Sequence, residues 1–287
     1  MNGSQRLNVS AGVASVAVAL VLVAIKAWAL AATGALSVAT SLADSAVDLF
    51  ASAAGLAGIV YAAKPPDEDH SFGHSSAEDL VALGQALLIT ASAGLIGWNA
   101  VHRLADPPPL AAEAAGLVVM VVSIVITLGL VLWQGRVARD TGSRIVSADR
   151  LHYVGDLVPS IGAMVALFAS KRLGIGWLDP VIALFACVFL VVGARRIGLS
   201  AWNALMDRAA DPVLLAELGH IITAQPGVLA FHDLKTRTAG SRTFIQVHLE
   251  LDGSQSLQSA HDIGAAVRHA LLAAVPNSEV IIHKDPR

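Results

Sequence analysis

Six long runs of apolar residues fill the first two thirds of the chain. Each run has about 20 residues or more, the length that an α-helix needs to cross a hydrocarbon core of about 30 Å. Prolines and glycines separate neighbouring runs, as expected for the connections between helices. The pattern predicts six membrane-spanning helices, at about residues 11–32, 36–60, 79–101, 112–134, 147–170 and 178–199.

A different pattern begins after residue 208, where charged residues become frequent and apolar residues alternate with polar ones. Asp211-Pro212 resembles a helix N-cap followed by proline at the first helical position. The predicted fold class is a membrane all-α six-helix transmembrane domain, residues 1–208, followed by a cytoplasmic ferredoxin-like α+β domain, residues 209–287. The second domain has the order αββαβ, with a helix from 212 to about 225, strands at 229–238 and 242–251, a helix at 257–274 and a strand at 279–283.

The composition excludes an ordinary soluble protein, because 55% of the residues are hydrophobic, 14% are charged and the mean hydropathy is +0.65. The single cysteine, Cys187, lies in an apolar run, so one chain cannot form a disulfide or a thiolate metal cluster. The sequence contains no P-loop, no His-Glu-x-x-His and no Gly-x-Ser-x-Gly motif. We therefore expect neither an ATP-driven protein nor an enzyme, and no nucleic-acid partner.

The basic residues between the predicted spans indicate the orientation of the chain. An even number of spans places both termini on one side of the membrane, and Lys and Arg concentrate in cytoplasmic loops. The first apolar run is long and lacks a cleavage site, so we expect a retained span. The prediction is a multi-pass protein of the bacterial plasma (inner) membrane with both termini in the cytoplasm. The side that holds the termini carries Arg6, Lys64, Arg136, Arg139, Arg144, Arg195 and Arg196, and the other side carries Arg103, Lys171 and Arg172.

Four ionisable residues interrupt two of the apolar runs with the same spacing: Asp44 and Asp48 are four residues apart, and so are His152 and Asp156. In a helix such residues lie one turn apart on one face, with roughly 6 Å between Cβ atoms, so each pair presents two ligand groups in one direction. Two such helices facing each other would supply three carboxylates and one imidazole, which suit Zn²⁺ and other borderline divalent ions. The alternative is that these groups only form hydrogen bonds across a helix bundle.

Lys26 lies near the middle of the first predicted span. It could be a charge partner of the buried acids, or it could reach an interface or serve helix packing. The second interpretation is favoured, because the lysine side chain is long enough to reach outward.

The short connection after the second predicted span contains Asp67, His70 and His74. One carboxylate and two imidazoles within eight residues can close a zinc site. The alternative is a solvated acidic loop that only attracts cations.

Histidines are frequent in the C-terminal domain. His248 lies in a predicted strand between Val247 and Leu249, so its side chain points away from theirs. It could therefore meet His232 of the neighbouring strand.

Taken together, these motifs resemble those of the cation diffusion facilitator family, close to its bacterial zinc and iron efflux branch, and the resemblance covers nearly the whole chain. It implies a homodimer of six-helix subunits that exports a divalent metal in exchange for protons. It also implies that the second and fifth spans bring the four ligands together. The most specific residues are Asp44-x3-Asp48, His152-x3-Asp156, Asp67-Glu-Asp-His-Ser-Phe-Gly-His74 and Val280-Ile-Ile-His-Lys-Asp-Pro286.

The resemblance implies two further metal sites. Asp67, His70 and His74 match a second site of the family. A cytoplasmic cluster near the subunit interface is matched by His232, His248, His261, His283 and Asp285. Members similar to this chain often carry a lysine at the position of Ser76, which pairs with an acid matching Asp207 at the dimer contact. This chain has the acid but not the lysine, and Arg208 is an alternative partner. His102, His220 and His269 match no family role, and ordinary surface histidines are the favoured interpretation.

The leading prediction is therefore a proton-coupled exporter of divalent cations that works by alternating access. Zn²⁺ is the first candidate, both as the transported ion and as a structural or regulatory ion, and Cd²⁺ and Fe²⁺ are further candidates. Protons would be the counter-ion, because carboxylates and imidazole must lose their protons to bind a metal. The alternatives are an exporter selective for iron or manganese, a membrane metalloenzyme, and a metal-sensing membrane scaffold.

Overall fold

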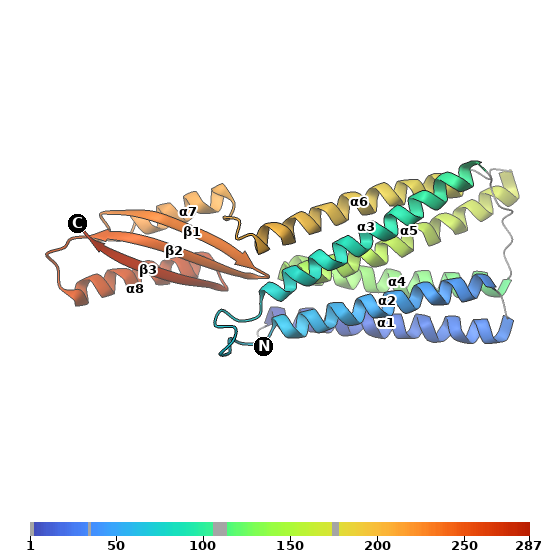
Figure 1. The fold of residues 1–287 in the computed structure, drawn as a ribbon, viewed down its shortest axis with the longest axis horizontal. Helices are drawn as coiled ribbons and strands as arrows, with labels where there is room; N and C mark the ends of the chain where they lie inside the picture. The colour runs from blue at the N-terminus through green and yellow to red at the C-terminus, as the bar shows by residue number, and fades with distance from the viewer. Residues whose placement is uncertain (1–2, 34–35, 106–113, 174–177) are drawn as a thin grey trace. The chain divides into compact units, whose positions relative to one another are not determined.

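The computed structural model describes residues 3–33, 36–105, 114–173 and 178–287. The start of the fourth predicted span, residues 112–113, lies outside these ranges. The chain divides into two compact units, Met1–Ala201 and Trp202–Arg287. The described part of the first unit is built from six long helices (Figure 1), namely α1 (Gly3–Thr33), α2 (Leu36–Ala62), α3 (Ser76–Ala105), α4 (Ala114–Thr141), α5 (Arg144–Leu173) and α6 (Leu178–Leu205), the last of which runs on into the second unit.

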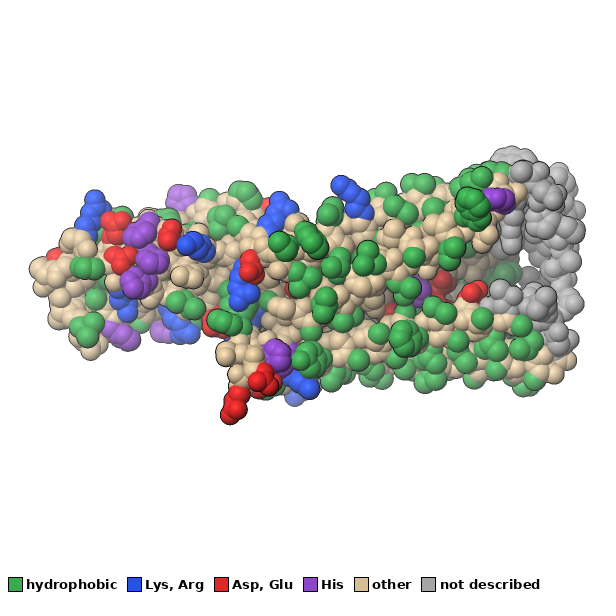
Figure 2. All heavy atoms as spheres, viewed as in Figure 1, with side chains coloured by type: hydrophobic (Ala, Val, Ile, Leu, Met, Phe, Trp, Pro, Cys, Tyr) green, Lys and Arg blue, Asp and Glu red, His purple; other side chains and the backbone are tan. Residues whose placement is uncertain are grey.

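Five of these helices, α1, α2, α3, α4 and α6, contain a stretch long and apolar enough to cross a membrane. Within the part of the chain that the structure describes, α5 offers no such stretch, since this part of the helix contains Asp149, Arg150 and Asp156, which lower its hydropathy. It packs against α1, α2, α3 and α4. Hydrophobic side chains cover much of the visible outer surface of the helices (Figure 2), as expected for helices that face lipid. The predicted class of helical transmembrane domain is confirmed.

Small residues allow the helices to approach closely. A Cβ atom at Gly58 of α2 would lie 2.7 Å from Cγ2 of Val81 in α3. A Cβ atom at Gly193 of α6 would likewise lie 2.7 Å from Cδ2 of Leu151 in α5. Membrane helices use such positions for tight packing because lipid supplies little hydrophobic driving force between them.

The second unit has the order α7 (Pro212–Thr223), β1 (Ala230–Ala239), β2 (Arg242–Leu251), α8 (Leu257–Ala274) and β3 (Ser278–Pro286). The sheet order is β1-β2-β3, with β1 antiparallel and β3 parallel to β2. Oδ1 of Asp211 accepts a hydrogen bond of 2.9 Å from the backbone N–H of Val213, so this residue caps α7 as predicted. The predicted order αββαβ is confirmed. β3 is longer than expected because it pairs with β2 along its whole length.

The core of the second unit lies on one face of the sheet. Alternate residues of β2 are buried there against both helices. The opposite face of β2 therefore carries the intervening residues, which include His248. The core residues are Ile245, Val247, Leu249 and Leu251 of β2, Leu218 and Ile222 of α7, and Val267 and Leu271 of α8.

Candidate metal centres

Asp48 of α2 and His152 and Asp156 of α5 come together inside the helical unit. Each offers a ligand atom, and these atoms lie within 4.8 Å of one another. Nε2 of His152 is 3.0 Å from Oδ1 of Asp48, and both side chains are largely buried, with 12% and 13% of their surface exposed. The geometry gives one imidazole and two carboxylates facing a common point, which is a donor set for a divalent cation.

The backbone hydrogen bonding of α5 changes next to these ligands. Pro159 lies inside the helix and has no N–H to donate to the carbonyl of Gly155. The hydroxyl of Ser160 donates a hydrogen bond of 2.6 Å to the carbonyl of Asp156. The helix therefore continues past the proline while one turn of its backbone hydrogen bonding is modified beside a ligand.

Asp44 and Lys26 lie near the three grouped residues without being part of the group. Asp44 is one turn before Asp48 on α2, and its carboxylate is not among the ligand atoms that come together in the described part of the chain. Nζ of Lys26 donates to Oγ of Ser45 at 2.7 Å and to the carbonyl of Ser41 at 3.2 Å. Lys26 thus joins α1 to α2, as the helix-packing interpretation expects. It also lines the cavity of about 50 Å³ that contains Asp48 and Asp156.

A chain of buried hydroxyls leads away from this cavity. Tyr153, which also lines it, has its hydroxyl 2.9 Å from Oγ of Ser52 and donates to the carbonyl of Ser15 at 3.3 Å. The hydroxyl of Ser15 in turn donates to Oγ of Ser52 at 2.9 Å. The three hydroxyls connect α1, α2 and α5 directly beside the grouped ligands.

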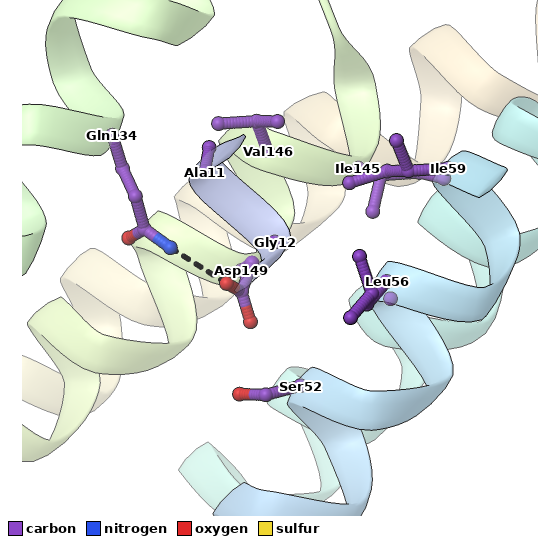
Figure 3. A pocket seen from close by; sticks show the side chains of 10 residues that line it. Ala11, Gly12, Ser52, Leu56, Ile59, Gln134, Ile145, Val146 and Asp149 are labelled. Carbon is purple, nitrogen blue, oxygen red and sulfur yellow. Dashed lines mark hydrogen bonds between the residues drawn. The ribbon is translucent and has the colours of Figure 1, made fainter. Parts of the chain in front are cut away.

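Asp149, which no sequence motif indicates, is buried near Ser52 (Figure 3). Nε2 of Gln134 in α4 donates to its Oδ2 at 2.6 Å, while its Oδ1 has no hydrogen-bond partner among the described residues. Both side chains line a cavity of about 10 Å³, near the smallest size that holds one water molecule. Two polar residues in apolar runs are a sequence signal, but only the packing of α4 on α5 identifies them as partners.

The three predicted residues of the loop after α2 also come together. The ligand atoms of Asp67, His70 and His74 lie within 4.8 Å of one another. Nδ1 of His70 is 3.2 Å from Oδ1 of Asp67, and Nε2 of His74 is 3.3 Å from Oδ2. Gly73, with φ of +81°, makes the turn that brings the two histidine rings within 4.5 Å.

The loop residues differ in exposure. His74 is buried, and its Nδ1 has no hydrogen-bond partner among the described residues. Asp67 is exposed, and the backbone N–H of His70 donates to its carboxylate at 2.7 Å. This hydrogen bond, with smaller contributions from the two imidazoles, holds the pKa of Asp67 below its usual value. The ionised carboxylate of Asp67 lies beside a buried imidazole nitrogen of His74 that lacks a hydrogen-bond partner among the described residues. This arrangement favours a cation site over a solvated acidic loop.

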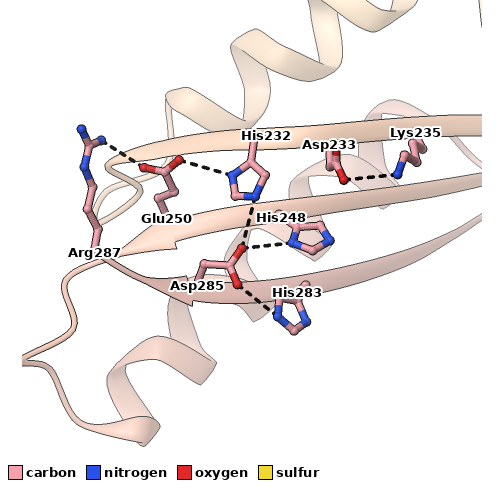
Figure 4. A network of polar contacts seen from close by, with 8 residues as sticks. All are labelled: His232, Asp233, Lys235, His248, Glu250, His283, Asp285 and Arg287. Atoms are coloured by element: carbon pink, nitrogen blue, oxygen red, sulfur yellow. Dashed lines mark hydrogen bonds and ion pairs between the residues drawn. The ribbon is translucent and has the colours of Figure 1, made fainter.

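A third group lies on the open face of the C-terminal sheet (Figure 4). His232 of β1 is directly opposite His248 of β2, which pairs in turn with His283 of β3. Asp285 joins the row, because its carboxylate lies 3.0 Å from Nδ1 of His248, 3.4 Å from Nε2 of His232 and 3.1 Å from Nε2 of His283. The ligand atoms of His232, His248 and Asp285 come within 4.8 Å of one another.

Two residues singled out by the resemblance stand apart from this row. His261 lies on α8 and is not in the group of ligand atoms within the described part of the chain. Asp207 has its Oδ1 3.3 Å from a guanidinium nitrogen of Arg237 in β1, so its partner here belongs to the same unit.

A multi-span helical unit with an Asp/His cluster between its helices, followed by a histidine-bearing α+β unit, defines a membrane carrier of metal cations. A family model of the cation efflux transmembrane domain matches residues 12–206, and a model of the cytoplasmic domain of cation efflux proteins matches residues 210–287. The chain therefore belongs to the cation efflux family, also called the cation diffusion facilitators.

The relatives found by sequence align with nearly the whole of this chain and with most of their own length. The cation-efflux pump FieF of Klebsiella pneumoniae is 40% identical over 283 residues, which are 98% of this chain and 93% of the relative. The FieF pump of Escherichia coli O1:K1 is 38% identical over the same shares. A solved structure of CzrB in its zinc form has 30% identity and a TM-score of 0.27, over 28% of this chain and 93% of that one. The protein is a cation efflux transporter of the membrane, and its relatives are not enzymes.

Proposed function

We propose that the protein exports divalent metal cations in exchange for protons, with Zn²⁺ first and Cd²⁺ and Fe²⁺ as further substrates. The observation that supports this most directly is the group formed by Asp48, His152 and Asp156 between α2 and α5. Its nitrogen and oxygen donors suit Zn²⁺, whereas Ca²⁺ and Mg²⁺ prefer larger all-oxygen shells. Asp44, one turn from Asp48, is the proposed fourth ligand and completes three carboxylates and one imidazole.

Proton coupling follows from the chemistry of these ligands. Metal binding requires deprotonated carboxylates and a neutral imidazole, so protons and metal compete for the site. In an alternating-access cycle, the metal expels protons on the cytoplasmic side and reprotonation expels the metal on the other side. His152 is the proposed main proton-linked ligand.

The proposed organisation is a homodimer in the inner membrane with both termini in the cytoplasm. The orientation rests on the many basic residues at the end of the bundle where α1 begins and α6 ends. The proposed boundary between the transport domain, 1–208, and the cytoplasmic domain, 209–287, lies within a few residues of the gap between the two family matches. Metal at the row of His232, His248, His283 and Asp285, with His261 as a further ligand, would tighten the dimer and favour transport when cytoplasmic metal is high.

The function is tested by flux of radioactive zinc and cadmium into vesicles that contain the purified full chain, with Asp48→Ala as the inactive control. We expect saturable zinc uptake that depends on an opposing proton gradient, with cadmium as a competitor. Preference for Fe²⁺ or Mn²⁺ over Zn²⁺ in competition would favour the alternative of an iron or manganese exporter. Binding without flux would favour the metal-sensing scaffold.

Two variants test the finer parts of the proposal. In His152→Ala, metal-stimulated proton flux should be lost, and unchanged proton flux would refute its role. A chain that ends after Arg208 should lose the metal dependence of transport if the cytoplasmic row is regulatory. If the metal dependence survives while the dimer dissociates, the role of that row is structural.

A further inference from the structure

A groove of about 380 Å³ lies between α5 and α6 at the end of the bundle where α5 begins. It is separate from the cavity of the grouped ligands, and no role in metal transport accounts for it. It is lined by Arg144, Ser147, Arg150, Leu151 and Val154 of α5 and by Phe189, Gly193, Arg196, Ile197 and Ser200 of α6.

The positively charged side chains of the groove favour the binding of an anion. The guanidinium of Arg144 is paired with Asp79 of α3, and its Nε donates to Oγ of Ser200 at 3.1 Å. Arg150 and Arg196 are exposed and have no acidic partner in the part of the chain that the structure describes. The groove therefore has two guanidinium groups available, and Ser200, which accepts from Arg144, keeps its own proton to donate.

The guanidinium of Arg150 lies against α4. A Cβ atom at Gly135 of α4 would lie 3.1 Å from Nε and 3.3 Å from Cζ of Arg150, so the guanidinium rests against the α4 backbone. Gly193 and Leu151, whose close contact is described above, also line the groove. The basic end is thus a built feature between three helices, since a larger residue at Gly135 or Gly193 would displace its walls.

The opposite end of the groove is apolar. Phe189 lies seven residues before Arg196 on α6, which places the two about 10 Å apart along the helix axis. On α5, Val154 lies one turn beyond Arg150, further from the end of the bundle. Polar groups at the membrane surface and apolar groups about 10 Å deeper match the headgroup and upper acyl chain of a phospholipid, whereas free phosphate would use only the basic end.

We propose that this groove binds an anionic phospholipid, with the headgroup phosphate between Arg150 and Arg196 and the acyl chains along Val154 and Phe189. Under the proposed orientation the lipid comes from the cytoplasmic leaflet, but binding depends neither on the transported metal nor on proton coupling. The bound headgroup bridges α6 to the part of α5 that leads into His152 and Asp156.

The test is native mass spectrometry of the purified full chain in neutral detergent, titrated with phosphatidylglycerol. We expect one tightly held lipid per chain. The variant Arg150→Gln/Arg196→Gln should bind it about 25-fold more weakly, because each arginine near an anionic lipid contributes about a factor of five. The matched control is Arg136→Gln/Arg139→Gln, which removes two exposed arginines from the same end of the bundle outside the groove. It should bind within about twofold of the native chain.

Further experiments distinguish a lipid headgroup from free phosphate and control for misfolding of the variants. Arg150→Lys/Arg196→Lys, which keeps the charge, should retain most of the binding. The proposal is overturned if both glutamine pairs lose equal affinity, if phosphatidylcholine binds as tightly as phosphatidylglycerol, or if inorganic phosphate displaces the lipid. Exclusion of the lipid from dimers of the full chain would also overturn it, because a second copy would then cover the groove.

Discussion

Nε2 of His152 lies 3.0 Å from Oδ1 of Asp48, although 104 positions separate them in the sequence. This contact joins α2 to α5 at the point where the carboxylate of Asp156 also lies nearby. It orients the two ligands, because an imidazole and a carboxylate that share a hydrogen bond satisfy each other in a largely buried place. A cation that binds here must displace this hydrogen bond and replace it with its own bonds to the two side chains.

The first prediction concerns Asp48. Asp48→Asn keeps the shape of the side chain but removes the charge that binds a cation. We expect the zinc affinity of the full chain to fall at least about 100-fold, since even residues that only orient metal ligands commonly cost 10–100-fold. Isothermal calorimetry in detergent measures this, with Asp140→Asn, an exposed acid at the end of α4, as the matched control. Equal affinities in the two variants would remove Asp48 from the site.

The second prediction concerns Lys26. Its ammonium group shares a cavity with Asp48 and Asp156 and lies near both carboxylates. Lys26→Met keeps much of the apolar stem and removes the positive charge that competes with a cation. We expect zinc affinity to rise about tenfold and turnover to fall, because release becomes slower. Calorimetry and vesicle flux on one preparation check both parts, and weaker zinc binding would show that Lys26 supports the site mainly by packing.

The third prediction compares three histidines of the C-terminal unit. His232→Ala should remove one bound zinc per full chain, because His232 shares Asp285 with His248. His269→Ala on α8 is the control and should leave zinc stoichiometry unchanged. His261→Ala separates two interpretations, since the family resemblance assigns it to the cluster while the observed group omits it. Loss of zinc in His261→Ala would indicate that the ligands gather differently in the metal-bound dimer. The metal content after dialysis measures all three.

Features of the fold that depend on a single local rule, such as a helix cap or the alternation of a strand, could be predicted from the sequence. The helix expected at 257–274 coincides with α8, since Ser256 provides a clear N-cap and accepts from the backbone N–H of Ser259 at 3.2 Å. The alternation along β2 predicted that His248 points away from Val247 and Leu249, and the strand register places it opposite His232. The i, i+4 spacing likewise indicated the face of α5 that carries His152 and Asp156.

Other features depend on how the helices are rotated against one another. The sequence favoured an outward or packing role for Lys26 but did not identify Ser41 and Ser45 of α2 as its partners. Asp44 has the same spacing signal as its neighbour, yet only Asp48 meets His152 in this structure. Such outcomes are set by close contacts between small residues on different helices, and periodicity within one helix carries no information about them.

The last prediction concerns the buried pair of Asp149 and Gln134, which no motif indicated. Asp149→Ala leaves the amide N–H of Gln134 without its acceptor in a buried place, which should destabilise the helical unit by about 1–3 kcal/mol. Asp149→Asn keeps an oxygen at the same position, which can still accept from Nε2 of Gln134, and should cost much less. Thermal unfolding of the full chain in one detergent measures the difference. If the two variants unfold at the same temperature, the 2.6 Å hydrogen bond contributes little to stability, and the charge of Asp149 is the property that matters.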